Sequence, residues 1–310
     1  MKVIEANHVY KVFGRRPSDG VKKLKAGKTR DQLRKSGQTA AVIDTSFDVD
    51  KGEIFVVMGL SGSGKSTLIR MVNGLLPITA GNMTLYGEDL AHVSKSKLRE
   101  LRRERVSMVF QNFALLPHRT VGENAAYGLE IQGVGRSERE RRAKEALSLV
   151  GLEGWGGYKP GELSGGMRQR VGLARALAAE TDILLMDEAF SALDPLIRRE
   201  MQDQLIDLQG KLGKTILFIT HDLNEAMRLG DRIAMMRDGR VEQVGTAEEI
   251  LRDPASDYVS RFVADVDRTR VLTAGSIAEP PYAVLGSDRS PRAAHKLLRE
   301  NQPPWLLVQN

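Results

Sequence analysis

The chain has 310 residues, no cysteine and a formal net charge of +6. This length is enough for a full core and a subdomain, and the absence of cysteine excludes disulfides and thiolate-bound metals. It contains no apolar run of about 18 residues. Residues 1–5 lead directly into a predicted strand over 2–13, so we expect neither a membrane-spanning segment nor a signal peptide.

The positive charge is concentrated in residues 15–35, which hold nine Lys and Arg against two Asp, a balance of +7 that leaves −1 for the rest of the chain. A nucleic-acid partner is therefore not indicated for the core. The segment interrupts the predicted sheet, which resumes over 42–58, and its Leu24 and Leu33 are too sparse to predict a core helix. Two interpretations stay open: a solvated loop, or contact of residues 15–35 with anionic lipid or an acidic partner.

A glycine-rich segment follows the buried strand predicted over 54–58 and precedes a helical pattern. It fits the phosphate-binding pattern G-x-x-x-x-G-K-[ST], and the residues predicted to bind nucleotide are Gly59, Leu60, Ser61, Gly62, Ser63, Gly64, Lys65, Ser66 and Thr67. Glycines let backbone N–H groups approach phosphate oxygens, and the helix start adds positive potential. We expect Lys65 to contact the β- and γ-phosphates and Ser66 to offer its hydroxyl to Mg²⁺. The strand–loop–helix context disfavours an ordinary Gly/Ser turn.

An apolar run over 183–186 ends in Asp187 and Glu188, which predicts a buried parallel strand with carboxylates at its C-terminal edge. We expect Asp187 to hold Mg²⁺ through its water shell, because Mg²⁺ uses few carboxylates. Successive strand residues point to opposite sides, which leaves Glu188 free to position or deprotonate the attacking water.

Two further polar residues end predicted strands. His221 follows the strand over 215–220, and Gln111 follows the strand over 106–110. A single histidine is more often structural than catalytic, but this position favours a hydrogen bond to the γ-phosphate and orientation of Glu188. We expect Gln111 to contact Mg²⁺ or the attacking water.

Further along the chain, capping patterns predict several helices. Ser164 is a good N-cap, and Gly165 and Gly166 expose N–H groups, so residues 163–170 open either a simple capped helix or an anion-binding one. Asp194-Pro195 predicts the start of a helix reaching about residue 212. Three more signals are a capping box over Ser137–Glu140 opening a helix to Val150, a hairpin turn at Asp238-Gly239, and a capped short helix at Thr246–Glu249.

Taken together, the glycine-rich loop, the Ser164-Gly165-Gly166 element and the Asp187-Glu188 pair resemble the ATP-binding cassette family over about residues 3–265. The resemblance implies an α/β P-loop NTPase fold with a mixed sheet core, an antiparallel β subdomain and an inserted helical subdomain over about 88–162. It implies Mg²⁺-dependent ATP hydrolysis, with adenine stacked on Phe13 or, as the alternative, on Tyr10.

In this family the element at residues 163–170, called the signature, closes over the γ-phosphate of ATP bound to the partner subunit. The resemblance therefore implies a homodimer through an ATP sandwich, with contacts from Ser164, Gly165, Gly166, Met167 and Asp194. Met167 stands where the family usually has Gln, which leaves backbone phosphate binding intact and affects only side-chain contacts.

Within the family, the chain resembles the ATP-binding subunit of bacterial importers for glycine betaine, proline or choline. The residues that carry this resemblance are Met58–Gly62, Phe113–His118, the Met-containing signature and Asp187–Pro195. It implies two transmembrane permease subunits that meet residues 113–121, an external substrate-binding protein, and a peripheral location on the cytoplasmic face of the membrane. The alternatives are an importer ATPase for another small polar solute, such as an amino acid, or a non-transport cassette ATPase.

We thus expect an ATPase domain over residues 1–265, with a basic insertion at 15–40, and an appendage over 266–310. In the appendage, Ser290–Glu300 predicts a short helix and Trp305–Val308 a strand. This order resembles the opening of a cystathionine-β-synthase-type regulatory module, which needs roughly twice the residues present.

Overall fold

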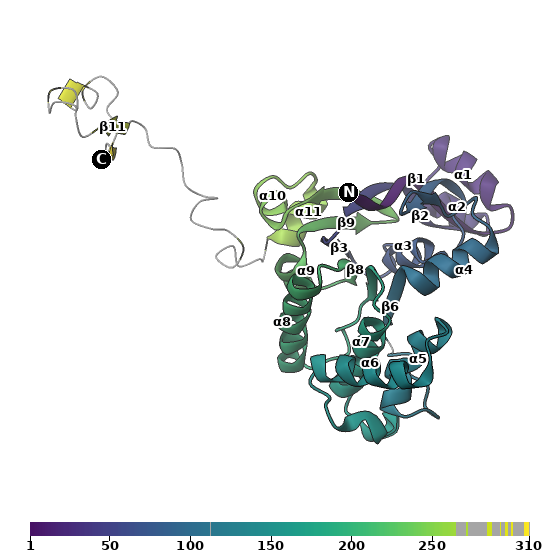
Figure 1. The fold of residues 1–310 in the computed structure, drawn as a ribbon. Helices are drawn as coiled ribbons and strands as arrows, with labels where there is room; N and C mark the ends of the chain where they lie inside the picture. The colour runs from purple at the N-terminus through teal and green to yellow at the C-terminus, as the bar shows by residue number, and fades with distance from the viewer. Residues whose placement is uncertain are drawn as a thin grey trace. The chain divides into compact units, whose positions relative to one another are not determined.

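The computed structural model describes residues 1–111 and 113–264, together with residues 271, 284–286, 292, 295, 296, 299 and 307–309 (Figure 1). The chain divides into two compact units, Met1–Val266 and Asp267–Asn310. In the second unit, β11 (Val284–Gly286) pairs in parallel with β12 (Leu307–Gln309). The predicted strand over 305–308 overlaps β12, whereas Trp305 and most of the predicted helix over 290–300 lie outside the described residues.

The first unit is built on a six-stranded sheet in the order β10-β9-β3-β8-β7-β6. Its strands are β3 (Ile54–Met58), β6 (Val106–Phe110), β7 (Ile183–Asp187), β8 (Thr215–Thr220), β9 (Arg232–Arg237) and β10 (Arg240–Gly245). The strands from β9 to β6 run in parallel, and β10 closes the edge as an antiparallel hairpin at the predicted Asp238-Gly239 turn. Every residue of β3, β7 and β8 is buried, which explains their uninterrupted apolar character.

A second, four-stranded antiparallel sheet has the order β2-β1-β4-β5. Its strands are β1 (Lys2–Gly14), β2 (Gln38–Asp50), β4 (Ala80–Leu85) and β5 (Glu88–Asp89). The sequence placed residues 42–58 in one resumed sheet. In the structure β2 pairs with β1 and β3 joins the parallel sheet, with a turn at Lys51-Gly52 between β2 and β3.

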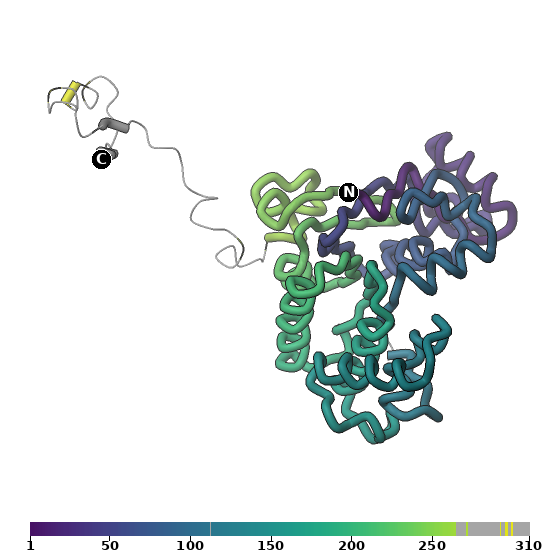
Figure 2. The backbone as a smooth tube through the Cα atoms, in the orientation of Figure 1, coloured from purple at the N-terminus to yellow at the C-terminus, as the bar shows by residue number. Residues whose placement is uncertain are grey.

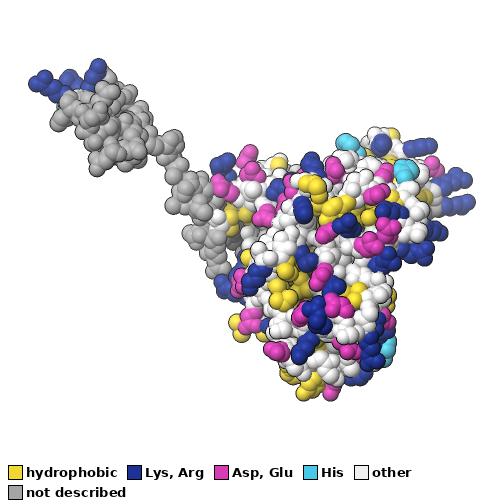
Figure 3. Space-filling model, in the orientation of Figure 1, with side chains coloured by type: hydrophobic (Ala, Val, Ile, Leu, Met, Phe, Trp, Pro, Cys, Tyr) yellow, Lys and Arg dark blue, Asp and Glu magenta, His cyan; other side chains and the backbone are white. Residues whose placement is uncertain are grey.

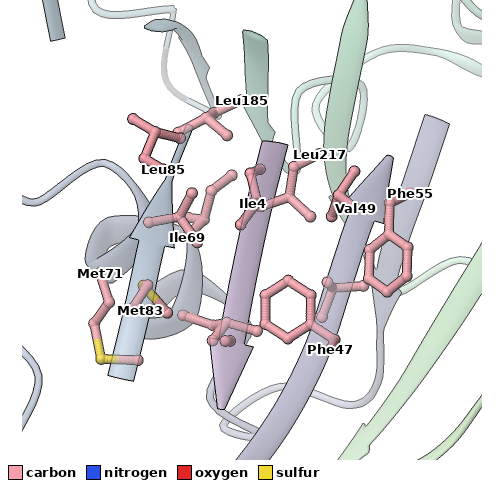
Figure 4. Packing of buried hydrophobic residues seen from close by; sticks show 14 of the residues in the cluster. Ile4, Phe47, Val49, Phe55, Ile69, Met71, Met83, Leu85, Leu185 and Leu217 are labelled. Carbon is pink, nitrogen blue, oxygen red and sulfur yellow. The ribbon is translucent and has the colours of Figure 1, made fainter. Parts of the chain in front are cut away.

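The core lies where the two sheets enclose α3 (Lys65–Val72). In Figure 4, Ile4 from β1 and Met83 from β4 lie near Ile69 and Met71 of α3, while Leu217 approaches from β8. All five are fully or almost fully buried. This packing fixes the helix start and therefore the loop that precedes it.

The basic insertion is folded, contrary to the expectation that its leucines were too sparse for core helices. It forms α1 (Pro17–Lys25) and α2 (Arg30–Lys35), which lie beside β1 and β2 (Figure 2). Val21, Leu24 and Leu33 are buried there, and the strands provide the rest of the small core: Tyr10, Val12, Ala40 and Ile43. Three apolar residues from the insertion are enough to build this small core, because β1 and β2 supply the larger share of the buried surface.

Between β5 and β7 the described chain forms four α-helices. Three of them, α5, α6 and α7, pack together at one end of the unit (Figure 1). The four helices are α4 (Lys95–Glu104), α5 (Val121–Ile131), α6 (Arg136–Leu149) and α7 (Gly165–Ala178), with the short 3₁₀ turns η1 (Trp155–Gly157) and η2 (Pro160–Glu162). The predicted capping box at Ser137 is wrong. The N-cap is Gly135, so the helix begins two residues earlier, and an Arg136–Glu140 ion pair at 2.8 Å supports its first turn.

The remaining helices are α8 (Pro195–Leu212), α9 (Leu223–Leu229), α10 (Ala247–Arg252) and α11 (Asp257–Val263). Asp194 caps α8 and Thr246 caps α10 in a capping box with Glu249, which confirms both predictions. No helix in the described part of the chain is both long and apolar enough to cross a bilayer.

Candidate active site

The phosphate loop joins β3 to α3, and two of its glycines sit where only glycine fits. Gly59 has a φ of 151° and Gly64 a φ of 108°. A Cβ at Gly59 would collide with the carbonyl oxygen of Met236, and one at Gly64 with that of Ala41. Both glycines let the loop lie directly against neighbouring strands.

Lys65 begins α3 and folds back over the loop. Its Nζ donates to the carbonyl oxygens of Gly59 at 2.8 Å and Leu60 at 3.2 Å. The side chain is 4% exposed, and this burial lowers the pKa of Lys65, although the nearby Glu188 and Asp187 oppose the shift. The loop therefore holds its cation in place before any phosphate arrives.

The interior of the loop has the chemistry of an anion site. Gly64 is the N-cap of α3 and offers no side-chain acceptor, so the first N–H groups of the helix have no partner within the helix. The Ser63 hydroxyl is buried with no hydrogen-bond partner in the described structure. Unpaired donors around a buried lysine suit a polyphosphate.

The candidate metal position lies beside Ser66 and Asp187. The Ser66 hydroxyl donates to Asp187 Oδ1 at 3.0 Å, and burial raises the pKa of the Asp187 carboxyl. Within the described residues no three His, Asp or Glu side chains cluster as a metal cage. One carboxylate and one hydroxyl fit Mg²⁺, which retains water ligands and binds substrate phosphates. When bound there, Mg²⁺ would neutralise charge on the phosphate oxygens.

Three of the residues predicted to act on ATP, His221, Gln111 and Lys65, converge on the fourth, Glu188. Its Oε2 lies 3.1 Å from His221 Nδ1 and 3.4 Å from Gln111 Nε2, and its Oε1 lies 3.7 Å from Lys65 Nζ. The Glu188 N–H donates to the carbonyl of Ile219 at 3.0 Å, which fixes the chain just beyond β7. The group combines a carboxylate, an imidazole, an amide and a cation beside the phosphate loop.

The signature element lies apart from this group. Ser164 caps α7 by accepting from the Met167 N–H at 3.2 Å. With Gly165, Gly166 and Asp194 it lines a different pocket of about 570 Å³. Among the described residues no hydrogen bond joins the signature to the phosphate loop. One chain therefore presents two separate half-sites.

Arg198 is a residue that sequence reasoning missed. From the first turn of α8 it donates to three backbone carbonyls of one loop, those of Phe190 (3.2 Å), Ser191 (3.3 Å) and Leu193 (3.1 Å). It thereby fixes the loop between Glu188 and the α8 start. The sequence carries no local signal for this role, because the contacts depend on how α8 folds back.

The two aromatic candidates for stacking on adenine differ in accessibility. Phe13 is 38% exposed, and Lys11 Nζ lies 5.0 Å from its ring centre. Tyr10 is 6% exposed and belongs to the small core beneath the insertion helices. Phe13 therefore has a ring face available, whereas Tyr10 does not.

The ABC transporter family model matches residues 42–191. Among curated proteins, the chain is 56% identical to the glycine betaine transport ATP-binding protein OpuAA of Bacillus subtilis, covering 96% of this chain and 71% of that protein. It is 52% identical to ProV of Escherichia coli, a glycine betaine/proline betaine transport ATP-binding protein, covering 98% and 77%.

A relative named for a different substrate is the trimethylamine N-oxide transport ATP-binding protein TmoW of Ruegeria pomeroyi, 52% identical over 89% of this chain and 81% of that protein. Among solved structures, the dimeric cassette MJ0796 in a post-hydrolysis state with ADP and Pi superposes with a TM-score of 0.67. It is 31% identical, and the match covers 79% of this chain and 98% of that chain. The phosphate loop, the carboxylate pair and the separate signature half-site thus belong to an ATP-hydrolysing member of the ABC transporter family.

Proposed function

We propose that this chain is the ATP-hydrolysing subunit of an importer for a methylated amine, with glycine betaine as the first candidate. The observation that carries the substrate class is the identity of 52–56% to several glycine betaine transport ATP-binding proteins, over 96–98% of this chain. Trimethylamine N-oxide is the second candidate, on the basis of the 52% identity to TmoW. Both candidate solutes carry a trimethylated nitrogen with a formal positive charge and no N–H group.

In the proposed reaction, ATP lies on the phosphate loop with its γ-phosphate near Lys65 and its adenine against Phe13. Glu188 accepts a proton from, or orients, the attacking water, and His221 and Gln111 hold that carboxylate in position. These roles are supported by the contacts of His221 and Gln111 with Glu188 Oε2, at 3.1 and 3.4 Å. Asp187 and Ser66 would hold Mg²⁺.

Two copies complete each site. Ser164, Gly165, Gly166 and Met167 of one protomer close over ATP bound by the other, and Asp194 lies at the same boundary. The separation of the signature pocket from the phosphate loop within one chain supports this arrangement. Two solved structures of the related cassette MJ0796 are dimeric.

The permease contact is proposed for residues 113–121 at the helical end of the unit. Phe113 and Ala114 both have left-handed backbone, with φ of 59° and 45°. Arg175 of α7 donates to the carbonyls of both residues, at 3.2 and 2.7 Å. Next to this turn a groove of about 860 Å³ is lined by His118, Arg119 and residues of α5 and α6. We place the chain at the cytoplasmic face of the membrane through this contact.

The test is copurification from membranes with mass spectrometry of the bound subunits, followed by solute-dependent ATPase assays on the reconstituted complex. We expect two permease subunits and stimulation by glycine betaine together with its binding protein. Stimulation by trimethylamine N-oxide alone would select the second candidate. Recovery without any permease, in membranes where the chain is expressed at its natural level, would contradict the transport function.

A further inference from the structure

We propose that Arg30, in the insertion between β1 and β2, is a positioning residue for the phosphate loop, and that the insertion affects ATP binding through it. The proposal rests on ATP hydrolysis by this chain and adds a contact from outside the nucleotide site. Arg30 Nη2 donates to the carbonyl oxygen of Gly62 at 2.9 Å, and Nη1 lies 3.2 Å from Asp238 Oδ1. In the described structure no other hydrogen bond joins the insertion to the phosphate loop.

The contact falls at the point where the loop must keep its peptide groups oriented. The Gly62 carbonyl is held by Arg30, and the next carbonyl, that of Ser63, accepts from the Gly239 N–H at 2.9 Å. In a planar trans peptide the N–H points away from the C=O of the same unit. Holding the Ser63 carbonyl outward thus turns the Gly64 N–H toward the phosphate side.

The peptide group between Gly62 and Ser63 is held at both its C=O and its N–H. Its N–H, that of Ser63, donates to the Leu60 carbonyl at 3.1 Å and closes a turn at the tip of the loop. Arg30 and Leu60 therefore fix the same peptide group from opposite sides. If Arg30 releases Gly62, this turn loses one of its two anchors, and the N–H groups that face the phosphates lose their fixed direction.

Arg30 can do this because its helix is itself anchored. Thr29 and Gln32 form a reciprocal capping box at the start of α2, and Leu33, three residues along the helix from Arg30, is 1% exposed in the small core. The guanidinium is planar and reaches two acceptors at once, which a lysine ammonium does with less geometric definition. The Arg30 side chain is 30% exposed, so the contact is at the edge of the loop rather than inside it.

The chain supplies a matched control. Arg34 lies one turn further along α2 and is exposed, and its side chain makes no hydrogen bond or ion pair in the described part of the structure. Arg34→Gln removes the same charge from the same helix without touching the phosphate loop. A difference between Arg30→Gln and Arg34→Gln therefore reports the contact to Gly62 rather than the charge of the insertion.

The experiment measures steady-state ATP hydrolysis by the full chain against ATP concentration for wild type, Arg30→Gln, Arg30→Lys and Arg34→Gln, with thermal unfolding of each. Losing a charged donor from the loop weakens ground state and transition state alike, so we expect KM for ATP to rise about fivefold to tenfold in Arg30→Gln with kcat within about twofold. Arg30→Lys should recover part of the loss, and Arg34→Gln should match wild type.

A second readout keeps the proposal open to refutation if Arg30→Gln folds poorly. Asp238→Asn leaves Arg30 in place but removes its carboxylate partner, and ATP binding is measured directly in a Glu188→Gln background. We expect a smaller loss of affinity than in Arg30→Gln. Equal ATP affinity in Arg30→Gln, Asp238→Asn and Arg34→Gln would overturn the proposal, as would a fall in kcat at unchanged KM. Absence of ATP hydrolysis in wild type would instead refute the proposed function.

Discussion

His221 Nδ1 lies 3.1 Å from Glu188 Oε2, and the Glu188 backbone has a left-handed φ of 47°. Such a conformation is costly for a residue with a side chain and is common where function requires it. It follows directly after β7 and turns the Glu188 carboxylate toward Lys65 and His221 instead of along the strand. The orientation of this carboxylate thus depends on the turn as much as on the alternation of strand residues.

The first prediction concerns this carboxylate. Glu188→Gln keeps the shape and the contact to His221 but cannot accept a proton, so ATP should bind without turnover. We expect the hydrolysis rate to fall about 10²–10⁴-fold, the usual contribution of a positioned base. Gel filtration with ATP should show a stable dimer. Exposed Glu153→Gln is the matched control, and turnover of Glu188→Gln within about twofold of wild type would remove the proposed role.

The second prediction follows from the two half-sites. Ser164→Arg places bulk and charge where the partner's γ-phosphate should lie, so hydrolysis should collapse. ATP affinity of the monomer should change little, because the phosphate loop is untouched. Ser164 also caps α7, so unfolding should show a loss of about 1 kcal/mol. A parallel fall of monomer affinity and turnover would mean that the signature acts within its own chain.

A third prediction uses a buried carboxyl in α9. Glu225 is 5% exposed, accepts from Gln202 Nε2 at 3.0 Å, and has a pKa raised by burial above the ordinary 4.5. For an acid whose pKa is raised in the folded state, stability is lost as pH rises through that pKa. Glu225→Gln should therefore stabilise the fold at pH 8, by on the order of 1 kcal/mol.

The same variant should have no advantage below pH 4.5, where the wild-type carboxyl is protonated in both the folded and unfolded states. Thermal unfolding at the two pH values, with Glu153→Gln as control, measures the difference. Equal stabilisation at both pH values would show that the gain comes from packing of the amide and not from removal of the buried carboxylate charge.

The fourth prediction concerns the charge of the insertion. Lys22, Lys23, Lys25 and Lys28 are exposed, and cationic side chains gather at the edge of the unit where α1 lies (Figure 3). Each cation near an anionic membrane contributes about 1 kcal/mol of attraction. Replacing all four with Gln should weaken binding to vesicles rich in anionic lipid and flatten its salt dependence.

The control for that experiment replaces four exposed lysines dispersed over the unit, namely Lys51, Lys95, Lys144 and Lys211. It removes the same net charge without altering the insertion. If both quadruple variants bind vesicles like wild type, the basic segment is a solvated surface.

The fifth prediction is that the appendage holds no nucleotide site of its own. Residues 276–310 lie mostly outside the described residues, and none of the residues predicted to bind nucleotide falls among them. Deleting them should leave ATP hydrolysis within a few-fold of that of the full chain. Equilibrium dialysis that finds a second adenine-nucleotide site, lost on deletion, would contradict this.

Local sequence was informative wherever a short rule fixes the geometry. The apolar runs before Gln111, Asp187 and His221 predict parallel strands, and the carboxyl ends of parallel strands meet at one sheet edge. That reasoning alone brings these side chains together, as the structure has them. The helix caps at Asp194 and Thr246 could be predicted equally well, because a cap depends on neighbours within three residues.

The features that escaped prediction depend on distant partners. Leu24 and Leu33 look isolated in the sequence because most of the surface that buries them belongs to β1 and β2. Arg30 and Asp238 are 208 positions apart, so no spacing rule connects them. The left-handed turn at Glu188 is imposed by the contact with β8 and not by its own residue type, which disfavours that conformation.

Gly14 and Gln38 are directly opposite each other in the β1–β2 ladder, so the chain leaves and re-enters the sheet at one place. A segment with adjoining ends can be gained or lost during evolution without changing the strand order. Its loss here would expose Tyr10 and Val12 on the outer face of the hairpin, creating an apolar patch prone to aggregation. A form of this fold without the segment would therefore need polar residues at those strand positions.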